Sequence, residues 1–257
     1  MCLLAVYFHV AEDAPVVVGA NREEFYARGG DSPRLHGRPV RFLGGVDPLA
    51  GGTWLGINEH GLIAAVTNRP KNHDPSLQKG PLRSRGLLVR DLLGLDGAAA
   101  AVDQATRALG QHAYAGCNLL LVDRRHAFVV HAGDWLRVRP LPAGIHVLSN
   151  GDVNDPRDQR LVYALAWLQQ HRHHTARTCT EALKALCSQA GNGTPPICLH
   201  GADRGTVSST LIVLGGKESR HSRRTLPAPS QYLHCQGPPD HRPYEDYSAL
   251  LSQLGTS

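Results

Sequence analysis

The chain has 257 residues, of which 42% are hydrophobic and 19% are charged. This composition supports a sizeable core and excludes wholesale disorder, collagen, coiled coils and small disulfide scaffolds. The formal net charge is +5, but the arginines are spread along the chain without interleaved aromatic residues, so we expect no nucleic-acid partner. No stretch reaches the ~18 uninterrupted apolar residues of a membrane helix, so we expect no integral membrane segment.

The first part of the chain is typical of strands. Apolar, β-rich runs at residues 3–10 and 15–20 predict a hairpin that brings the N-terminus onto a central strand. Residues 29–39 are rich in Gly, Pro and Arg and predict a loop. Two further runs, 53–57 and 62–67, flank a polar turn that ends in Gly61 and predict a second hairpin.

The rest of the chain alternates between helical and strand patterns. Periodic apolar residues predict helices at residues 84–95, 95–110, 158–170 and 180–189. Strands are predicted at residues 117–122, 127–131, 135–138, 144–149 and 207–214. From about residue 215 a polar, Pro-rich tail follows, with a short strand at 232–235 and an amphipathic end near 247–251. Because no linker divides two cores, residues 2–257 are predicted to form one α+β domain.

The six cysteines are widely and irregularly spaced, and no CxxC pair occurs. We therefore expect no zinc ribbon, and a reducing, cytoplasmic compartment. Several ligand-capable residues do lie near one another in sequence, but their spacing matches no standard zinc pattern. We read them as solvated side chains and expect no metal site; they are His171, His173, His174 and Cys179, and Cys198 with His200.

Cys2 stands out because an initiator methionine before a small residue is usually removed. The mature chain would then carry a thiol and a free α-amino group on one residue. An α-amino group has a reference pKa of ~7.7–8.0, so it is a weak base near neutral pH. This is the arrangement of an N-terminal nucleophile, in which the amine assists deprotonation of the thiol that attacks a carbonyl. The plain alternative is a small apolar residue at the start of a strand.

Other candidate site residues follow predicted strands. A charged cluster at residues 21–24, Asn-Arg-Glu-Glu, comes directly after the second strand, and a carboxylate there could orient the amine. Trp54, in Gly-Gly-Thr-Trp-Leu-Gly-Ile, could cover a pocket. Asn68 and Asn150 each follow a strand and could donate a hydrogen bond to an oxyanion. Each asparagine alone is more typical of a turn.

Taken together and in order, these motifs resemble one family. Seven motifs occur in this order: Met-Cys at the start, Ala-Asn-Arg-Glu-Glu-Phe-Tyr, Gly-Gly-Thr-Trp-Leu-Gly-Ile, Val-Thr-Asn, Cys-Asn-Leu-Leu-Leu, Leu-Ser-Asn and Ser-Ser-Thr-Leu-Ile-Val-Leu. In this combination the chain resembles the NRDE family, also called the transport and Golgi organisation protein 2 family. The resemblance covers residues 2 to about 214. This family in turn resembles the N-terminal nucleophile (Ntn) hydrolases of the penicillin V acylase and bile salt hydrolase type.

The resemblance implies a four-layer αββα sandwich with Cys2 at a strand end, facing a cleft. It also implies catalytic roles for Cys2 as nucleophile, Glu23 as the carboxylate near the amine, and Asn68 and Asn150 either in an oxyanion hole or in orienting the amine. Asn21, Arg22, Trp54 and Arg204 are the expected binding residues.

Two departures from the family pattern bear on activity. The Asn-Arg-Asp-Glu motif reads Asn21-Arg22-Glu23-Glu24, so its carboxylate is one methylene longer. The late strand carries Val207 where the acylases keep an arginine beside the nucleophile, and Arg204 is the nearest replacement in sequence.

The sequence thus leads to two functions of different classes. The first is a cysteine Ntn amidohydrolase that cleaves a C–N amide bond of a small or acyl substrate and needs no cofactor. The second is a non-enzymatic carrier or chaperone for an amphiphile, since the resemblance implies links to haem trafficking and to acyl-CoA or lipid homeostasis. In that case haem would be cargo, with Cys2, His9 or His60 as an axial ligand. The Met-Cys start favours the enzyme, and Val207 favours the carrier.

Overall fold

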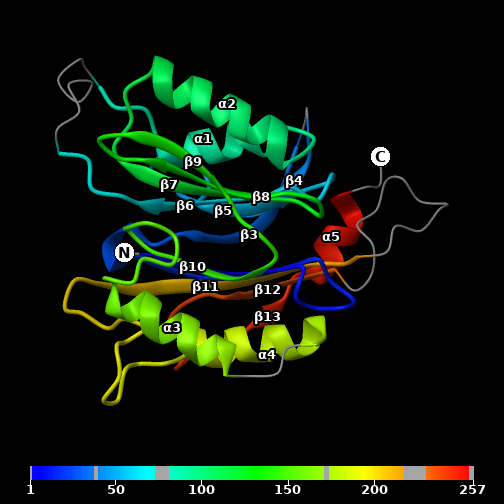
Figure 1. Ribbon diagram of the computed structural model, residues 1–257, viewed down its shortest axis with the longest axis vertical. Coiled ribbons are helices and arrows are strands. Elements are labelled where there is room, and N and C mark those ends of the chain that lie inside the picture. The colour runs from blue at the N-terminus through cyan, green and yellow to red at the C-terminus, as the bar shows by residue number, and fades with distance from the viewer. Residues whose placement is uncertain (1, 38–39, 73–80, 171–173, 217–229, 255–257) are drawn as a thin grey trace.

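The computed structural model describes residues 2–37, 40–72, 81–170, 174–216 and 230–254. Two antiparallel sheets stack face to face, and a pair of helices covers the outer face of each, which gives four layers (Figure 1). Within the described residues, no helix is long and apolar enough to cross a membrane.

Sheet A has six strands in the order β10-β1-β2-β11-β12-β13. Its central strands are β1 (Leu3–Phe8), β2 (Val16–Phe25) and β11 (Arg204–Leu214). β10 (Gly144–Leu148) lies at one edge, and β12 (Gln231–Cys235) and β13 (Glu245–Asp246) lie at the other. Because β1 is flanked on both sides, the residue before it lies in the interior of the sheet and not at its edge.

Sheet B has seven strands in the order β3-β4-β5-β6-β7-β8-β9. The strands follow chain order from one edge to the other, as a meander does. Their bounds are β3 Asp31–His36, β4 Phe42–Val46, β5 Leu55–Asn58, β6 Ile63–Asn68, β7 Cys117–Val122, β8 Ala127–Ala132 and β9 Leu136–Pro140.

Side-chain caps begin three of the helices. α1 (Arg85–Leu92) is capped by the Ser84 hydroxyl, which accepts from the Leu87 N–H, and α2 (Ala98–Gln111) follows it over sheet B. On the outer face of sheet A, Asp158 caps α3 (Gln159–Gln169), and Thr175 caps α4 (Ala176–Cys187). A side-chain acceptor at the cap satisfies a helix N–H that would otherwise lack a partner. A short helix, α5 (Ser248–Leu254), and a 3-10 turn, Tyr26–Arg28, complete the described elements.

Strand alternation divides the core into three layers. Leu4, Val6 and Phe8 of β1 face the other sheet and join the cluster between the two sheets. Leu3, Ala5 and Tyr7 face the opposite way and pack against α3 and α4. A third cluster lies between sheet B and helices α1 and α2. The two faces of β1 thus pack in different layers of the core, because successive side chains of a strand point to opposite faces.

Most predicted elements are present, but two expectations are wrong. Residues 31–36, predicted as loop, form β3, which pairs with the unpredicted β4. Pro33 is tolerated there because β3 is an edge strand, and the pairing is irregular around it. The charged cluster 21–24 does not follow the second strand but belongs to it, because β2 continues to Phe25 alongside β11.

The described part of the tail contains both elements that the sequence predicts. The predicted short strand is β12, and the amphipathic end near 247–251 forms most of α5. The part of the tail at residues 217–229 lies outside the described residues.

Candidate active site

Cys2 lies immediately before β1, between two strands that carry predicted site residues. In the ladders, Leu3 pairs with Asn21 of β2, and Leu4 pairs with Leu148 of β10. Cys2 lies just beyond both ladders, and if their register continued its neighbours would be Arg22 of β2 and Asn150 after β10. Cys2 has the same strand parity as Leu4 and Val6, so it belongs to the face of sheet A that looks toward sheet B.

A small cleft of about 80 Å³ opens beside Cys2. Sheet A contributes Cys2, Arg22 and Glu23 to its lining, and the facing side contributes Trp54 and Asn68. The backbone at Gly52 approaches Gly86 closely, and only glycine permits this, because a Cβ at Gly52 would lie 2.3 Å from the Gly86 carbonyl carbon. The backbone before β5 therefore packs directly on the start of α1, and the cleft is polar and narrow.

Arg22 is the arginine of this cleft whose charge acts on the Cys2 thiol. Its side chain is buried, and its guanidinium carbon lies 4.2 Å from the centroid of the Trp54 ring. The guanidinium also donates to the Gly29 carbonyl and lies 4.0 Å from a Glu24 carboxylate oxygen. Burial lowers the pKa of Arg22, while the nearby Cys2 and Glu24 raise it. A stacked and buried guanidinium is held in one orientation, in contrast to a solvated surface arginine.

The environment of Cys2 favours the neutral thiol. Burial is the main reason that its pKa is raised, and the negative charge of Glu23 adds to the effect. A hydrogen bond from the Glu23 backbone and the charge of Arg22 act in the opposite direction and lower the pKa. A thiol in this setting needs a base before it can act as a nucleophile.

Glu23 is buried and paired with an arginine that the sequence analysis missed. Its Oε1 accepts a hydrogen bond of 2.6 Å from the Arg160 guanidinium, in the first turn of α3. Burial raises the pKa of Glu23, although the charge and hydrogen bond of Arg160 lower it. The same arginine also donates to the Pro196 carbonyl, at 2.9 Å. The only sequence signal was its place just after the Asp158 cap, which does not reveal the pairing.

The two asparagines come from opposite sheets. Asn68 ends β6 and lines the cleft, whereas Asn150 lies in the loop after β10. The Asn150 Oδ1 atom is buried and has no hydrogen-bond partner among the described residues. Its loop is tied to sheet B, since the Thr67 hydroxyl and the Asn118 amide both donate to the Ser149 carbonyl, at 2.6 and 3.0 Å.

Two predicted binding residues point elsewhere. The Asn21 amide donates to the carbonyls of Cys187 and Ile197, at 2.9 and 3.1 Å, and so lies on the helix-covered side of sheet A. The Arg204 guanidinium stacks over the Phe25 ring, 4.9 Å from its centroid. Arg204 lines a second pocket of about 480 Å³, which it shares with Glu23, Pro196, Leu199 and His200. Neither residue is among those that line the Cys2 cleft.

The remaining sequence candidates are also placed by the fold. Val207 lies where the pairing of β11 with β2 shifts register, between Thr206 and Ser208. His9 follows the far end of β1, roughly 20 Å along the strand from Cys2 at ~3.3 Å per residue. His60 lies in the turn before β6, 3.5 Å from a carboxylate oxygen of Asp96. Neither histidine is beside Cys2, so neither can share a haem iron with it.

Solved structures of low sequence identity share this fold. A Caenorhabditis elegans N-acylethanolamine-hydrolyzing acid amidase orthologue aligns with TM-score 0.58 and 18% identity over 82% of this chain and 92% of that chain. Penicillin V acylase from Agrobacterium tumefaciens aligns with TM-score 0.57 and 14% identity over 96% and 86%. A C2A mutant of conjugated bile acid hydrolase from Clostridium perfringens aligns with TM-score 0.56 and 11% identity, over 97% of this chain and 93% of that chain. These likenesses confirm the predicted αββα sandwich of Ntn-hydrolase type.

Sequence comparison identifies closer relatives. Transport and Golgi organization protein 2 homologues from Bos taurus and Homo sapiens are 35% and 34% identical to this chain, over 168 and 172 residues. Each alignment covers 61% of this chain and 59% of the relative, so less than two thirds of the relatives' length is matched. The family model described as Transport and Golgi organisation 2 matches residues 1–218, and the chain therefore belongs to this family.

Proposed function

We propose that this protein is a cysteine amidohydrolase of the Ntn type, with Cys2 as the nucleophile that cleaves a C–N amide bond. The observation that supports the proposal is the polar cleft that Cys2 lines together with Arg22, Glu23 and Asn68. The fold supports it, since the three solved structures named above are an amidase, an acylase and a bile acid hydrolase.

The proposed reaction begins once Met1 has been removed. The free α-amino group of Cys2 takes the proton from Sγ, and the thiolate attacks the amide carbonyl carbon. The resulting oxyanion accepts hydrogen bonds from the side-chain amides of Asn68 and Asn150. Collapse of this intermediate breaks the C–N bond, and the Cys2 ammonium protonates the leaving amine. Water then hydrolyses the thioester and restores the thiol.

Arg22 and Glu23 have supporting roles in this scheme. Arg22 lowers the pKa of the Cys2 thiol and so favours the thiolate. Glu23 is fixed by Arg160 and is proposed to orient the Cys2 ammonium. We place the reaction in the cytoplasm, since all six cysteines are free thiols, the usual state in a reducing compartment.

One observation favours a second function, a carrier of an amphiphilic ligand. The pocket of about 480 Å³ combines an apolar wall, Pro196 and Leu199, with the cation Arg204. That volume lies in the range of small-molecule sites, whereas the 80 Å³ cleft at Cys2 is far smaller. An acyl-CoA or haem would therefore bind in the larger pocket, away from Cys2.

The deciding experiment compares the wild type with Cys2→Ser and Cys2→Ala on a panel of acyl amides. Intact-mass spectrometry first establishes whether Met1 is absent from the protein used. We expect Cys2→Ala to abolish turnover and Cys2→Ser to reduce it with little change in substrate affinity, since the chemistry and not the contact area is altered. Cys179→Ala, a buried cysteine of α4, is the matched control and should keep full turnover.

Alkylation of the thiol gives an independent measure. With Met1 retained, the raised pKa should make Cys2 react more slowly than free cysteine at pH 7. With Met1 removed, the adjacent amine should make it react faster. If the processed protein alkylates no faster and cleaves no amide, the hydrolase proposal is wrong. Binding of acyl-CoA or haem that is lost in Arg204→Ala would then support the carrier.

A further inference from the structure

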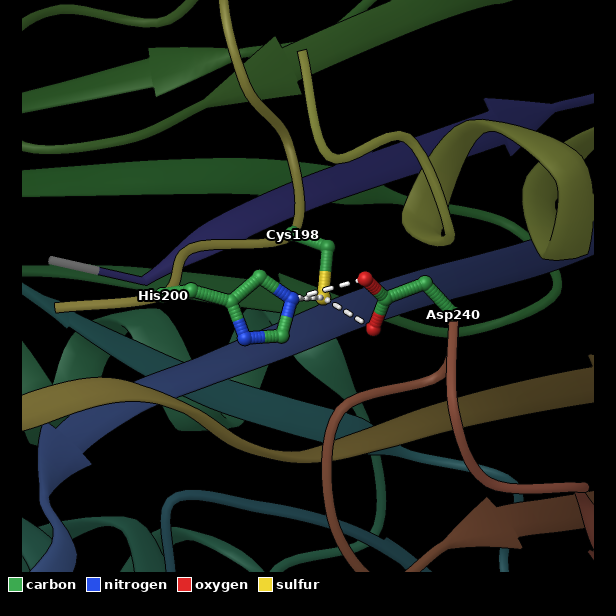
Figure 2. Close-up of side chains that lie close together, drawn as sticks. All are labelled: Cys198, His200 and Asp240. Atoms are coloured by element: carbon green, nitrogen blue, oxygen red, sulfur yellow. Dashed lines mark hydrogen bonds and ion pairs between the residues drawn. The ribbon is translucent and has the colours of Figure 1, made fainter. Parts of the chain in front are cut away.

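A second cluster of reactive side chains lies at the 480 Å³ pocket. Figure 2 shows Cys198, His200 and Asp240 pointing toward one another. The Cys198 Sγ atom lies 3.8 Å from His200 Nε2 and 3.2 Å from Asp240 Oδ1. His200 Nε2 is 2.7 Å from Asp240 Oδ2. One atom from each residue thus lies within 4.8 Å of the others.

The backbone holds these side chains firmly. Cys198 and His200 are two residues apart on an extended segment, so their side chains project to the same side. The segment is fixed by a hydrogen bond from the Cys198 N–H to the Gln189 carbonyl, at 2.8 Å, and by a bridge between His200 and Gly205. Asp240 comes from the turn after β12, in which the His241 and Arg242 N–H groups donate to the Pro238 carbonyl.

The geometry does not suit a Cys-His-Asp proton relay. In a relay the thiol and the carboxylate contact opposite nitrogens of the imidazole, so that a proton can pass between them. Here the same nitrogen, His200 Nε2, faces both the Cys198 sulfur and the Asp240 carboxylate. Sulfur, nitrogen and oxygen therefore converge on one point, as ligands around a metal ion do.

Two of the three distances are close to those of a metal coordination sphere, whereas the third, 2.7 Å between His200 Nε2 and Asp240 Oδ2, is that of a hydrogen-bonded pair that zinc would have to separate. Zn²⁺ binds cysteine sulfur at ~2.3 Å and histidine nitrogen or carboxylate oxygen at ~2.0–2.2 Å in tetrahedral geometry. Those bond lengths put neighbouring ligand atoms about 3.4–3.6 Å apart. The sulfur atom here lies 3.8 Å from the nitrogen and 3.2 Å from the oxygen. The mixed sulfur, imidazole and carboxylate set is one that zinc accepts.

We propose that Cys198, His200 and Asp240 form a zinc-binding site at the mouth of this pocket. Cys198 now donates its thiol proton to Asp240, and zinc would displace that proton to the solvent and bind the thiolate. No electron transfer is involved. His241, whose Nε2 lies 3.6 Å from Asp240 Oδ2, would help to orient the carboxylate. The proposal does not depend on the chemistry of Cys2.

The test uses the full chain after metal has been removed with a chelator. Zn²⁺ is titrated in competition with a chromophoric chelator, and Co²⁺ is followed by absorption. We expect one equivalent of either metal, and a thiolate-to-cobalt charge-transfer band. Cys198→Ser should remove the band, and His200→Ala and Asp240→Asn should each weaken zinc binding by more than the about 10–100-fold typical of outer-shell changes. Cys2→Ser is the matched control and should keep the band and the affinity.

Thermal unfolding separates loss of the site from loss of the fold. Without metal, each variant should unfold at nearly the temperature of the wild type, and added zinc should raise that temperature only in the wild type and in Cys2→Ser. His200 is 40% exposed, so His200→Ala remains informative even if the buried Cys198 does not tolerate substitution. The proposal is wrong if the wild type binds no zinc at micromolar concentration, or if binding survives in both His200→Ala and Asp240→Asn.

Discussion

The arginine whose charge acts on the Cys2 thiol is Arg22, and not the residue at position 207 or its nearest replacement, Arg204. The family pattern leads one to expect an arginine at position 207, and Arg204 was the nearest replacement. The structure instead places Arg204 over Phe25 and places Arg22 in the same cleft as Cys2, where its charge lowers the pKa of the thiol. Stacking on Trp54 fixes the Arg22 side chain. The charge near the thiol is thus supplied from β2, the strand next to Cys2.

Arg22→Met should therefore make Cys2 less reactive. Arg22 lowers the pKa of the Cys2 thiol, so removing its charge should raise that pKa further and slow alkylation at pH 7. One pKa unit would change the thiolate population, and with it the rate, by on the order of tenfold. The measurement is the pH dependence of Cys2 alkylation, followed by peptide mass spectrometry.

Arg28→Met is the matched control for this experiment. Arg28 lines the same cleft but is paired with Asp47, at 2.5 Å, and with Glu24, at 3.3 Å. Its removal should leave the alkylation profile of Cys2 close to that of the wild type. Equal effects of the two substitutions would show that Arg22 has no special relation to the thiol.

At the residue scale, four of the residues that the sequence singled out lie together in the structure. Cys2, Arg22, Trp54 and Asn68 line one cleft because each lies at or near the end of a predicted strand. The sequence could not show that Asn21 faces the helices, because the boundary of β2 was predicted too early and the alternation along the strand was not followed through residue 21. Consecutive residues of a short polar motif look like one site in the sequence, but in a strand their side chains point to opposite faces of the sheet.

At the scale of elements, the loop after β10 matters most for the candidate site. Asn118 of β7 lies in the other sheet, and its side-chain amide donates to the carbonyls of both Ser149 and Gly151, each at 3.0 Å. Asn150 lies between these two anchored carbonyls. The two sheets therefore jointly fix the loop that contains Asn150.

Asn118→Ala should loosen this loop. The Gly151 carbonyl loses the Asn118 donor, while the Ser149 carbonyl keeps the Thr67 hydroxyl. An unsatisfied buried group of this kind costs about 1–3 kcal/mol. We expect a lower unfolding free energy in urea and faster amide hydrogen exchange at residues 149–151. Gln104→Ala, on the exposed side of α2, should change neither measurement. Unchanged exchange in Asn118→Ala would show that Thr67 alone holds the loop.

Element types were more predictable from the sequence than element bounds. The β5–β6 hairpin and the helices were predicted because their apolar periodicity is strong and their turns carry clear signals. β3 and β4 were missed because residues 31–46 contain Gly, Pro and Arg, and their strand state depends on pairing with each other and with β5. α4 begins at Ala176 because Thr175 and Thr178 form a capping box, which the predicted start at residue 180 overlooked.

At the scale of the whole molecule, contacts between segments that are distant in the chain could not be predicted from the sequence. Cys198 and Asp240 are 42 residues apart, and they meet because β11 and β12 pair side by side and bring their flanking segments together. Arg160 reaches Glu23 across 137 residues because α3 packs on the outer face of sheet A. Such pairings follow from the order of strands in the sheets, which local patterns do not specify.

The response of the entire fold to acid can be traced in part to one buried histidine. His131 of β8 is 1% exposed, and its Nδ1 atom lies 2.7 Å from the Asn118 Oδ1 acceptor. Burial lowers the pKa of His131 to about 4, Arg69 adds to the effect, and Asp152 opposes it. The folded protein therefore keeps this imidazole neutral, whereas the unfolded chain protonates it near pH 6.5.

This difference makes the fold less stable in mild acid. Below the unfolded pKa of ~6.5, the unfolded state binds a proton that the folded state does not, so the unfolding free energy falls as the pH drops toward 4. Between pH 7.5 and 5.0, His131 should account for a loss of about 2 kcal/mol. Urea unfolding of the wild type and of His131→Gln at both pH values measures this, and the variant should lose about 2 kcal/mol less over the interval. Between pH 7.5 and 8.5 the two proteins should change in parallel, because His131 is neutral in both states there. If the wild type and His131→Gln lost the same unfolding free energy between pH 7.5 and 5.0, His131 would take up its proton without unfolding.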